Sequence, residues 1–192
     1  MMTISLQKGQ KISLEKAAPG ISAALIGLGW DVNPTDTGTD FDLDVSLFLL
    51  GEDDKLVSQK HFIFYNNLTS PDPNQSIQLM GDNKTGEGAG DDEAAIVDFR
   101  KVPQDIAKIT VTVTIHEADK RSQNFGQVSN AYVRVVNVET KDEVLRYDLD
   151  EDFSIETAII MAEFYRKDNE WRVNAVGSGY QGGLEALLSR YK

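Results

Sequence analysis

Apolar and polar residues alternate with a period of two along much of this chain. In Thr110–His116 the apolar side chains Val111, Val113 and Ile115 fall on one face and threonines on the other. The run Asp42–Leu49 alternates in the same way. Successive side chains of a β-strand point to opposite faces, so this period is typical of a strand with one buried face. Both segments are therefore predicted to be half-buried strands.

Shorter runs of the same kind indicate a β protein throughout. They lie between turns rich in Gly, Asn and Asp, at Ala23–Leu28, His61–Tyr65, Ala131–Val138 and Trp171–Val176. Crossover helices are missing between the runs, which argues against a parallel α/β sheet. The chain has 192 residues, enough for one full-sized domain. We predict an all-β protein with minor helix, a single β-sandwich domain over residues 1–192.

Two local features are predicted near the ends of the sequence. Ile4–Leu6 and Ile12–Leu14 flank Gly9 and are predicted to form a hairpin with each other. Leu184–Tyr191 follows two glycines and has the pattern of a short C-terminal amphipathic helix.

The negative charge of the chain is concentrated in two segments. The formal net charge is −12, which argues against nucleic acid as a partner. Between Asp31 and Asp54 there are eight acidic residues and no basic one, and between Asp82 and Glu93 there are five, with only Lys84 to oppose them. Such concentration destabilises a fold by self-repulsion unless a cation neutralises it.

Both acidic segments have the donor chemistry of a calcium site. Calcium takes six to eight oxygen ligands from carboxylates, carbonyls and water. Asp40, Asp42 and Asp44 are spaced two apart, which puts their carboxylates on one side of an extended strand. Gly81–Glu93 combines four glycines with up to six side chains that offer oxygen. Asp31 ends a predicted strand and is placed to reach the same region.

Other readings of these segments remain open at this point. Acidic turns are often simply solvated. Magnesium is a weaker alternative to calcium, since it wants fewer protein ligands and keeps its waters. An EF-hand is excluded by the lack of flanking helices and of the required glycine and glutamate positions. Zinc is disfavoured because cysteine is absent and because His61 and His116 lack ligand spacing.

The acidic motifs, with several others in the same order, resemble one known family. The segments that carry the similarity are Gly27–Asp31, Asp40–Asp44, Phe62–Asn67, Gly81–Gly88, Gly90–Glu93, Ile115–Ala118, Gln123–Val128, Glu156–Ala158 and Gly177–Leu184. The similarity runs from about Ile4 to Leu188, and these segments resemble the motifs of the TerD family of tellurite-resistance and general stress proteins.

The resemblance implies a β-sandwich that holds two calcium ions close together at one end. It also implies an interaction with other stress or tellurite-resistance proteins, in a complex that involves the membrane. The ligands that it implies, carried over by motif, are Asp31, Asp40, Asp42, Asp44, Asp82, Asn83, Glu87, Asp91, Asp92 and Glu93.

We expect a calcium-binding, non-enzymatic stress-response protein that acts as a calcium-dependent interaction module. The alternative is a C2-like module in which bound calcium bridges to lipid phosphate. A third hypothesis is an enzyme that uses paired carboxylates as general acid and base. It is disfavoured because so dense a cluster suits a metal cage better than a pair whose pKa values must differ. The catalytic motifs of hydrolases, P-loop proteins and metalloproteases are also missing from the sequence.

The sequence also leads us to expect a cytoplasmic protein. No stretch reaches the roughly 18 apolar residues that span a bilayer, and the first residues lack the apolar core of a signal peptide. No transmembrane segment is expected, and any contact with the inner face of the membrane would be peripheral.

Overall fold

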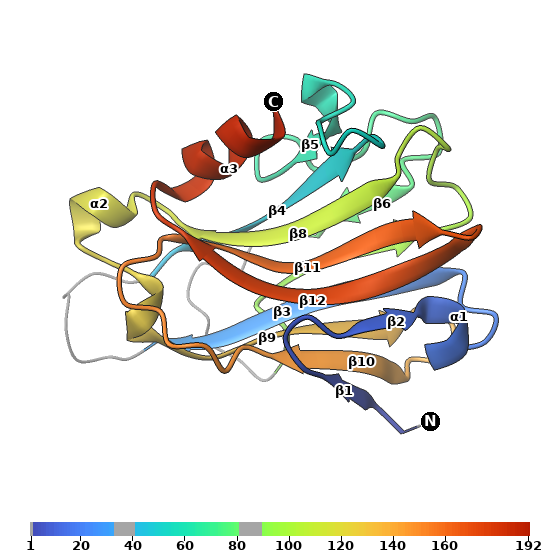
Figure 1. The fold of residues 1–192 in the computed structure, drawn as a ribbon, viewed down its shortest axis with the longest axis horizontal. Coiled ribbons are helices and arrows are strands. Elements are labelled where there is room, and N and C mark those ends of the chain that lie inside the picture. The colour runs from blue at the N-terminus through green and yellow to red at the C-terminus, as the bar shows by residue number, and fades with distance from the viewer. Residues whose placement is uncertain (1, 33–40, 81–89) are drawn as a thin grey trace.

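The computed structural model describes residues 2–32, 41–80 and 90–192, and in these ranges the chain forms two stacked β-sheets (Figure 1). Each sheet contains six strands within the described residues. The predicted all-β sandwich is therefore confirmed.

The first sheet has the order β1 (Ile4–Leu6), β10 (Glu143–Asp148), β9 (Val128–Asn137), β3 (Ala23–Val32), β7 (Glu93–Asp98) and β6 (Ile77–Leu79). The second has the order β2 (Lys11–Ser13), β12 (Glu170–Tyr180), β11 (Ala158–Lys167), β8 (Lys108–Ile115), β4 (Leu43–Leu50) and β5 (Phe62–Ile63). The helical segments are α1 (Leu14–Ala17), α2 (Ala118–Arg121) and α3 (Gly183–Tyr191), with short 3-10 turns at Gln59–His61 and Phe125–Gln127.

The core lies between the two sheets and is made by the inward-facing half of each strand. Ile26 and Leu28 of β3 face Val111 and Val113 of β8 within one buried cluster, and all four are at most 4% exposed. Residues that alternate with these inward positions lie on the outer faces of the sandwich. This alternation decides on which side of its strand each acidic residue lies.

The prediction that the runs containing β4 and β8 are half-buried is wrong. In β4, Ser46 and Phe48 are both 0% exposed, although they lie on the face opposite Val45 and Leu47. Thr110, Thr112 and Thr114 are 0%, 0% and 2% exposed, although they lie on the face opposite Val111 and Val113. A second apolar cluster, which includes Phe48 of β4 and Leu187 of α3, covers that outer face. The predicted C-terminal helix is thus confirmed as α3, and it packs against the second sheet (Figure 1).

The prediction of a hairpin between the first two strands is also wrong. The turn forms, with the Gln10 amide donating to the Gln7 carbonyl, but the two strands then enter different sheets. β1 pairs parallel with β10, whereas β2 pairs antiparallel with β12. Each strand has only three residues, so pairing with a longer strand of its own sheet replaces the local partner. The N-terminal segment therefore links the two sheets at one edge.

Among the described residues, no helix has both the length and the apolar character needed to cross a membrane.

Candidate metal centre

Three strands bring the six predicted ligands that the structure describes to one end of the sandwich. Asp31 lies near the end of β3, Asp42 and Asp44 lie at the start of β4, and Asp91–Glu93 lead into β7. β3 and β7 are antiparallel, with Leu28 opposite Glu93, so the end of one meets the start of the other. We call this end of the sandwich, with these six residues, the acidic end.

The Asp91 carboxylate is held on the outer face of the first sheet by Arg134 of β9. The Arg134 Nε atom donates to Asp91 Oδ1 at 2.7 Å, and Nη2 donates to Oδ2 at 3.0 Å. The Tyr132 hydroxyl donates to Asp91 Oδ1 at 3.1 Å. Burial first, and then the Asp91 charge, raises the pKa of Tyr132 to about 12, so its hydroxyl keeps its proton as a donor. A two-point guanidinium–carboxylate contact of this kind is both strong and directional.

Two glycines of β3 make room for this arrangement. Gly27 and Gly29 alternate with the buried Ile26 and Leu28 and therefore lie on the outer face. A Cβ atom at Gly27 would overlap the Asp91 carboxylate, and one at Gly29 would overlap the Tyr132 ring. The glycines in the motif that precedes Asp31 thus have a structural reason at this face.

Asp92 is buried and bound to the backbone of β3. It is 6% exposed, and its Oδ2 atom accepts a hydrogen bond from the Trp30 amide at 2.9 Å. Burial raises the pKa of Asp92 above its usual value; the Trp30 hydrogen bond opposes that rise, and the charges of Asp31 and Asp91 add to it. A buried carboxylate beside two other carboxylates is a position that a cation would stabilise.

Glu93 connects the two sheets. It is 5% exposed, and its Oε2 atom accepts from the Val45 amide of β4 at 3.1 Å. The three consecutive residues Asp91, Asp92 and Glu93 therefore bind three different strands, β9, β3 and β4. This segment ties the acidic end together across both sheets.

The remaining predicted ligands that the structure describes border this segment. Asp44 lies on the outer face of the second sheet, with its Oδ2 atom 3.4 Å from His116 Nδ1. The Asp42 carbonyl accepts from the His116 amide. Asp31 is exposed, and its Oδ2 atom accepts from the Asn130 side-chain amide at 2.7 Å.

The structure places six of the ten predicted ligands and does not test their role. Asp40, Asp82, Asn83 and Glu87 lie outside the described residues. Within residues 2–32, 41–80 and 90–192, no three His, Asp or Glu side chains converge as a metal shell. The donors present fit a hard cation in chemistry, since all six are carboxylates at one end of the sandwich. Further donors are needed to complete a shell around an ion.

Sequence reasoning missed the partners that hold the acidic segment. Arg134 and Tyr132 lie in a predicted strand, and the alternation of that strand places both on one face. Only the pairing of β9 with β3 shows which acidic residue they meet.

Replacing Asp92 with asparagine is expected to leave the metal-free protein at least as stable as the wild type at neutral pH. The folded state raises the pKa of Asp92 above 3.8, so folding favours the protonated form, and stability falls as pH rises from 3.8 to the raised value. Asparagine avoids this loss and keeps an oxygen for the Trp30 amide. In thermal melts with chelator, the melting temperature of the variant should therefore exceed that of the wild type by an amount that grows as pH rises above 3.8. The difference should stay constant once the pH is above the raised pKa of Asp92. A wild type that instead gains stability over the variant as pH rises would show that the folded protein favours the ionised carboxylate.

Comparison with known proteins places this geometry in context. The sequence profile of the TerD domain matches residues 2–191. General stress protein 16U of Bacillus subtilis (strain 168) is 57% identical over 190 residues, which cover 99% of this chain and 97% of that protein. Tellurium resistance protein TerD of Serratia marcescens is 52% identical over 190 residues, again with 99% and 97% coverage.

A solved structure shows the same fold. The crystal structure of a homologue of telluride resistance protein (TerD) from Streptomyces coelicolor A3(2) superposes with a TM-score of 0.67. It covers 88% of this chain and 96% of its own, at 23% sequence identity.

Proposed function

This chain belongs to the TerD family, and from that premise we propose that it is a calcium-binding, non-enzymatic stress-response protein that contributes to tellurium resistance. Relatives named for general stress and for tellurium resistance match it over nearly its full length. The protein would act by binding other proteins of the stress response in a calcium-dependent way.

The observation that carries the proposal is the way in which Asp91–Glu93 binds three strands. Asp92 contacts the backbone next to Asp31, and Glu93 contacts the backbone next to Asp44. The two buried carboxylates therefore lie at the junction of the two strands that carry the other described candidates. Asp91 is already paired with Arg134, so the described carboxylates that would hold calcium are the other five, those of Asp31, Asp42, Asp44, Asp92 and Glu93.

Bound calcium would supply positive charge that offsets the repulsion among these carboxylates. The residues of the chain then couple the site to the fold. The Asp92 carboxylate fixes the end of β3, and the Glu93 carboxylate fixes the start of β4. Because these strands belong to different sheets, holding both carboxylates in place orders the acidic end as a unit.

A hollow beside Asp44 is the part of this end that we propose contacts a partner. A cavity of about 300 Å³ lies between the end of β8, α2 and the start of α3, with Asp44, His116 and Tyr65 in its lining. Tyr65 is 47% exposed. Because this exposed aromatic side chain lies next to a candidate calcium ligand, partner binding there would depend on whether calcium is bound at the acidic end. We place the protein in the cytoplasm, where such a partner complex would lie at the inner face of the membrane.

The alternative is a C2-like module that binds membranes directly through calcium. Sedimentation with vesicles of phosphatidylserine and phosphatidylcholine, in calcium and in chelator, separates the two. The protein-partner proposal predicts that the protein stays in the supernatant in both conditions. Calcium-dependent sedimentation that Asp44→Asn abolishes would establish the membrane-binding function instead.

A further inference from the structure

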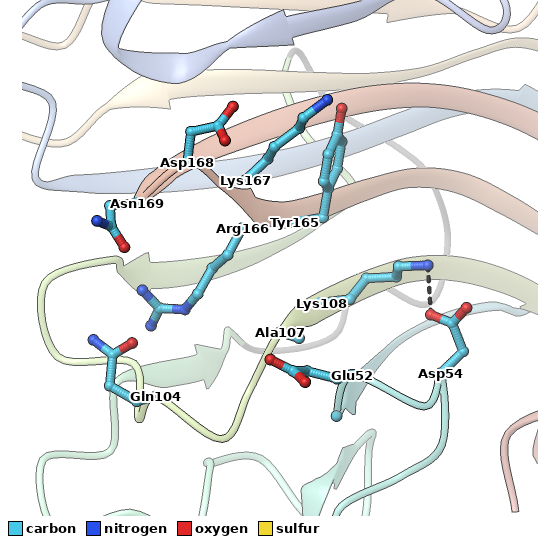
Figure 2. A pocket seen from close by; sticks show the side chains of 11 residues that line it. Glu52, Asp54, Gln104, Ala107, Lys108, Tyr165, Arg166, Lys167, Asp168 and Asn169 are labelled. Atoms are coloured by element: carbon cyan, nitrogen blue, oxygen red, sulfur yellow. Dashed lines mark ion pairs between the residues drawn. The ribbon is translucent and has the colours of Figure 1, made fainter.

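A larger hollow lies at the far end of β4 and β8 from the acidic end. Its cavity of about 620 Å³ is lined by residues 51, 52, 54, 104, 107, 108 and 165–169 (Figure 2). β4 runs from Leu43 beside the acidic end to Leu50 beside this pocket, a span of about 24 Å at ~3.4 Å per residue. The pocket is therefore separate from the candidate metal centre, and we refer to it as the distal pocket.

Arg166 of β11 is the residue that defines one side of the distal pocket. Its Nε atom donates to the Ile106 carbonyl at 3.1 Å, and Nη2 donates to the carbonyls of Val102 at 2.8 Å and Pro103 at 3.3 Å. The guanidinium also stacks on the Trp171 ring at 4.4 Å. These contacts anchor the segment before β8 and hold the side chain in one orientation.

The anchoring contacts do not use the whole guanidinium. Arginine has five N–H donors, and these three hydrogen bonds use the one on Nε and the two on Nη2. In the part of the chain that the structure describes, the two donors on Nη1 meet no hydrogen-bond acceptor. An immobilised pair of charged donors at the wall of a cavity is suited to an oxygen-rich anion.

The charge of Arg166 is also not neutralised by the protein. Its three hydrogen-bond partners are uncharged carbonyls, and no carboxylate of the described residues lies within 4.0 Å of the guanidinium. Burial lowers the pKa of Arg166, as expected for a cation without an anionic neighbour. Lys108 in the same pocket differs, since its Nζ atom lies 2.6 Å from Asp54 and 3.7 Å from Glu163.

Two neutral amides accompany the guanidinium. Figure 2 shows Gln104 and Asn169 on the same side of the distal pocket as Arg166, with the Lys108–Asp54 ion pair on the other side. Glu52 and Asp168 also line the pocket. The guanidinium side is thus rich in N–H donors, although Asp168 lies beside Asn169 on that side, and Glu52 lies between it and the Lys108–Asp54 pair.

We propose that the distal pocket binds a small molecule through an oxyanion group, a phosphate or a carboxylate, held by Nη1 of Arg166 and the side-chain amides of Gln104 and Asn169. The cavity volume falls in the range of small-molecule sites, roughly 300–1,000 Å³. The calcium proposal does not require this site, and this site does not require calcium.

Two probe ligands test the site in the full chain with chelator present. Inorganic phosphate and citrate are titrated separately by isothermal calorimetry and by NMR. Saturable binding that shifts the side-chain signals of Arg166 and Asn169 is expected for at least one probe. Binding of phosphate alone assigns phosphate as the recognised group, and binding of citrate alone assigns carboxylate. No saturable binding of either probe at millimolar concentration would overturn the proposal.

The variant Asn169→Asp gives the sharper test. Asn169 has a φ of 61°, a conformation that aspartate also tolerates, so the turn is expected to survive. The new carboxylate would compete for Arg166 and should weaken binding of the probe at least tenfold. The control is Arg100→Gln, which removes an exposed guanidinium paired with Asp98 outside the pocket and should bind as wild type does. Wild-type affinity in Asn169→Asp, with its fold confirmed by circular dichroism, would contradict the site.

Discussion

Replacing Asp44 with asparagine is expected to weaken calcium binding at least tenfold, which corresponds to about 1.4 kcal/mol. The change keeps the shape of the side chain and one oxygen but removes its negative charge. Calcium affinity depends on the number of charged carboxylate ligands, so losing one charge should weaken binding. Asp44 lies next to Val45, whose amide binds Glu93, so the change falls where β4 meets the acidic segment. Isothermal titration with calcium measures the effect.

Asp54, which follows the other end of β4, provides a matched control. Asp54→Asn also removes one carboxylate, from a residue paired with Lys108 beside the distal pocket. Asp54 has a φ of 60°, which asparagine accepts, so this change should not strain the backbone. Calcium affinity should be unchanged in Asp54→Asn. Equal affinity in wild type and Asp44→Asn would remove Asp44 from the set of ligands.

Replacing Gly27 with valine is expected to destabilise the protein by about 2–3 kcal/mol. Strand propensity alone predicts the opposite sign, because valine is favoured in strands and glycine is not. The structure predicts a loss because any Cβ atom at this position overlaps the Asp91 carboxylate. Asp91 cannot move away without breaking its two contacts with Arg134. A chain of this size should show a melting temperature lower by roughly 4–12 °C.

A double-mutant cycle identifies the cause of that loss. In an Asp91→Ala background the carboxylate is absent, so adding valine at Gly27 should cost much less than it does in the wild type. Residues in direct contact show coupling of roughly 0.5–3 kcal/mol in such cycles. An equal penalty in both backgrounds would mean that the clash with Asp91 is not the reason for the glycine.

Strands whose sequence alternates with a period of two were predictable, and a strand without that alternation was harder to find. β4 and β8 are evident from their period of two. β11 was not predicted, because Ala158–Ala162 is apolar without a break and all five residues are buried. A continuous apolar run carries no period from which a strand can be recognised. Its place between β12 and β8 follows only from the sheet.

The acidic end was predictable as chemistry and less so as geometry. The density of carboxylates and their similarity to a known family indicated which residues to consider. The contact between Arg134 and Asp91 joins residues 43 positions apart and depends on the register of β9 against β3. The contact between Glu93 and Val45 is also distant in sequence, and it depends on how the two sheets stack. Such pairings are set by packing of whole strands, which local patterns do not encode.

The central claim is that the acidic end binds calcium in the folded protein, and a thermal melt tests it most directly. Samples stripped with chelator, with their metal content checked by elemental analysis, are melted in chelator, in calcium and in magnesium. At a calcium concentration one hundred times the dissociation constant, native-state binding adds about 2.7 kcal/mol. That stabilisation should raise the melting temperature by roughly 5–11 °C in calcium, with little change in magnesium. An unchanged melting temperature in calcium, for a sample shown to be metal-free at the start, would contradict the claim.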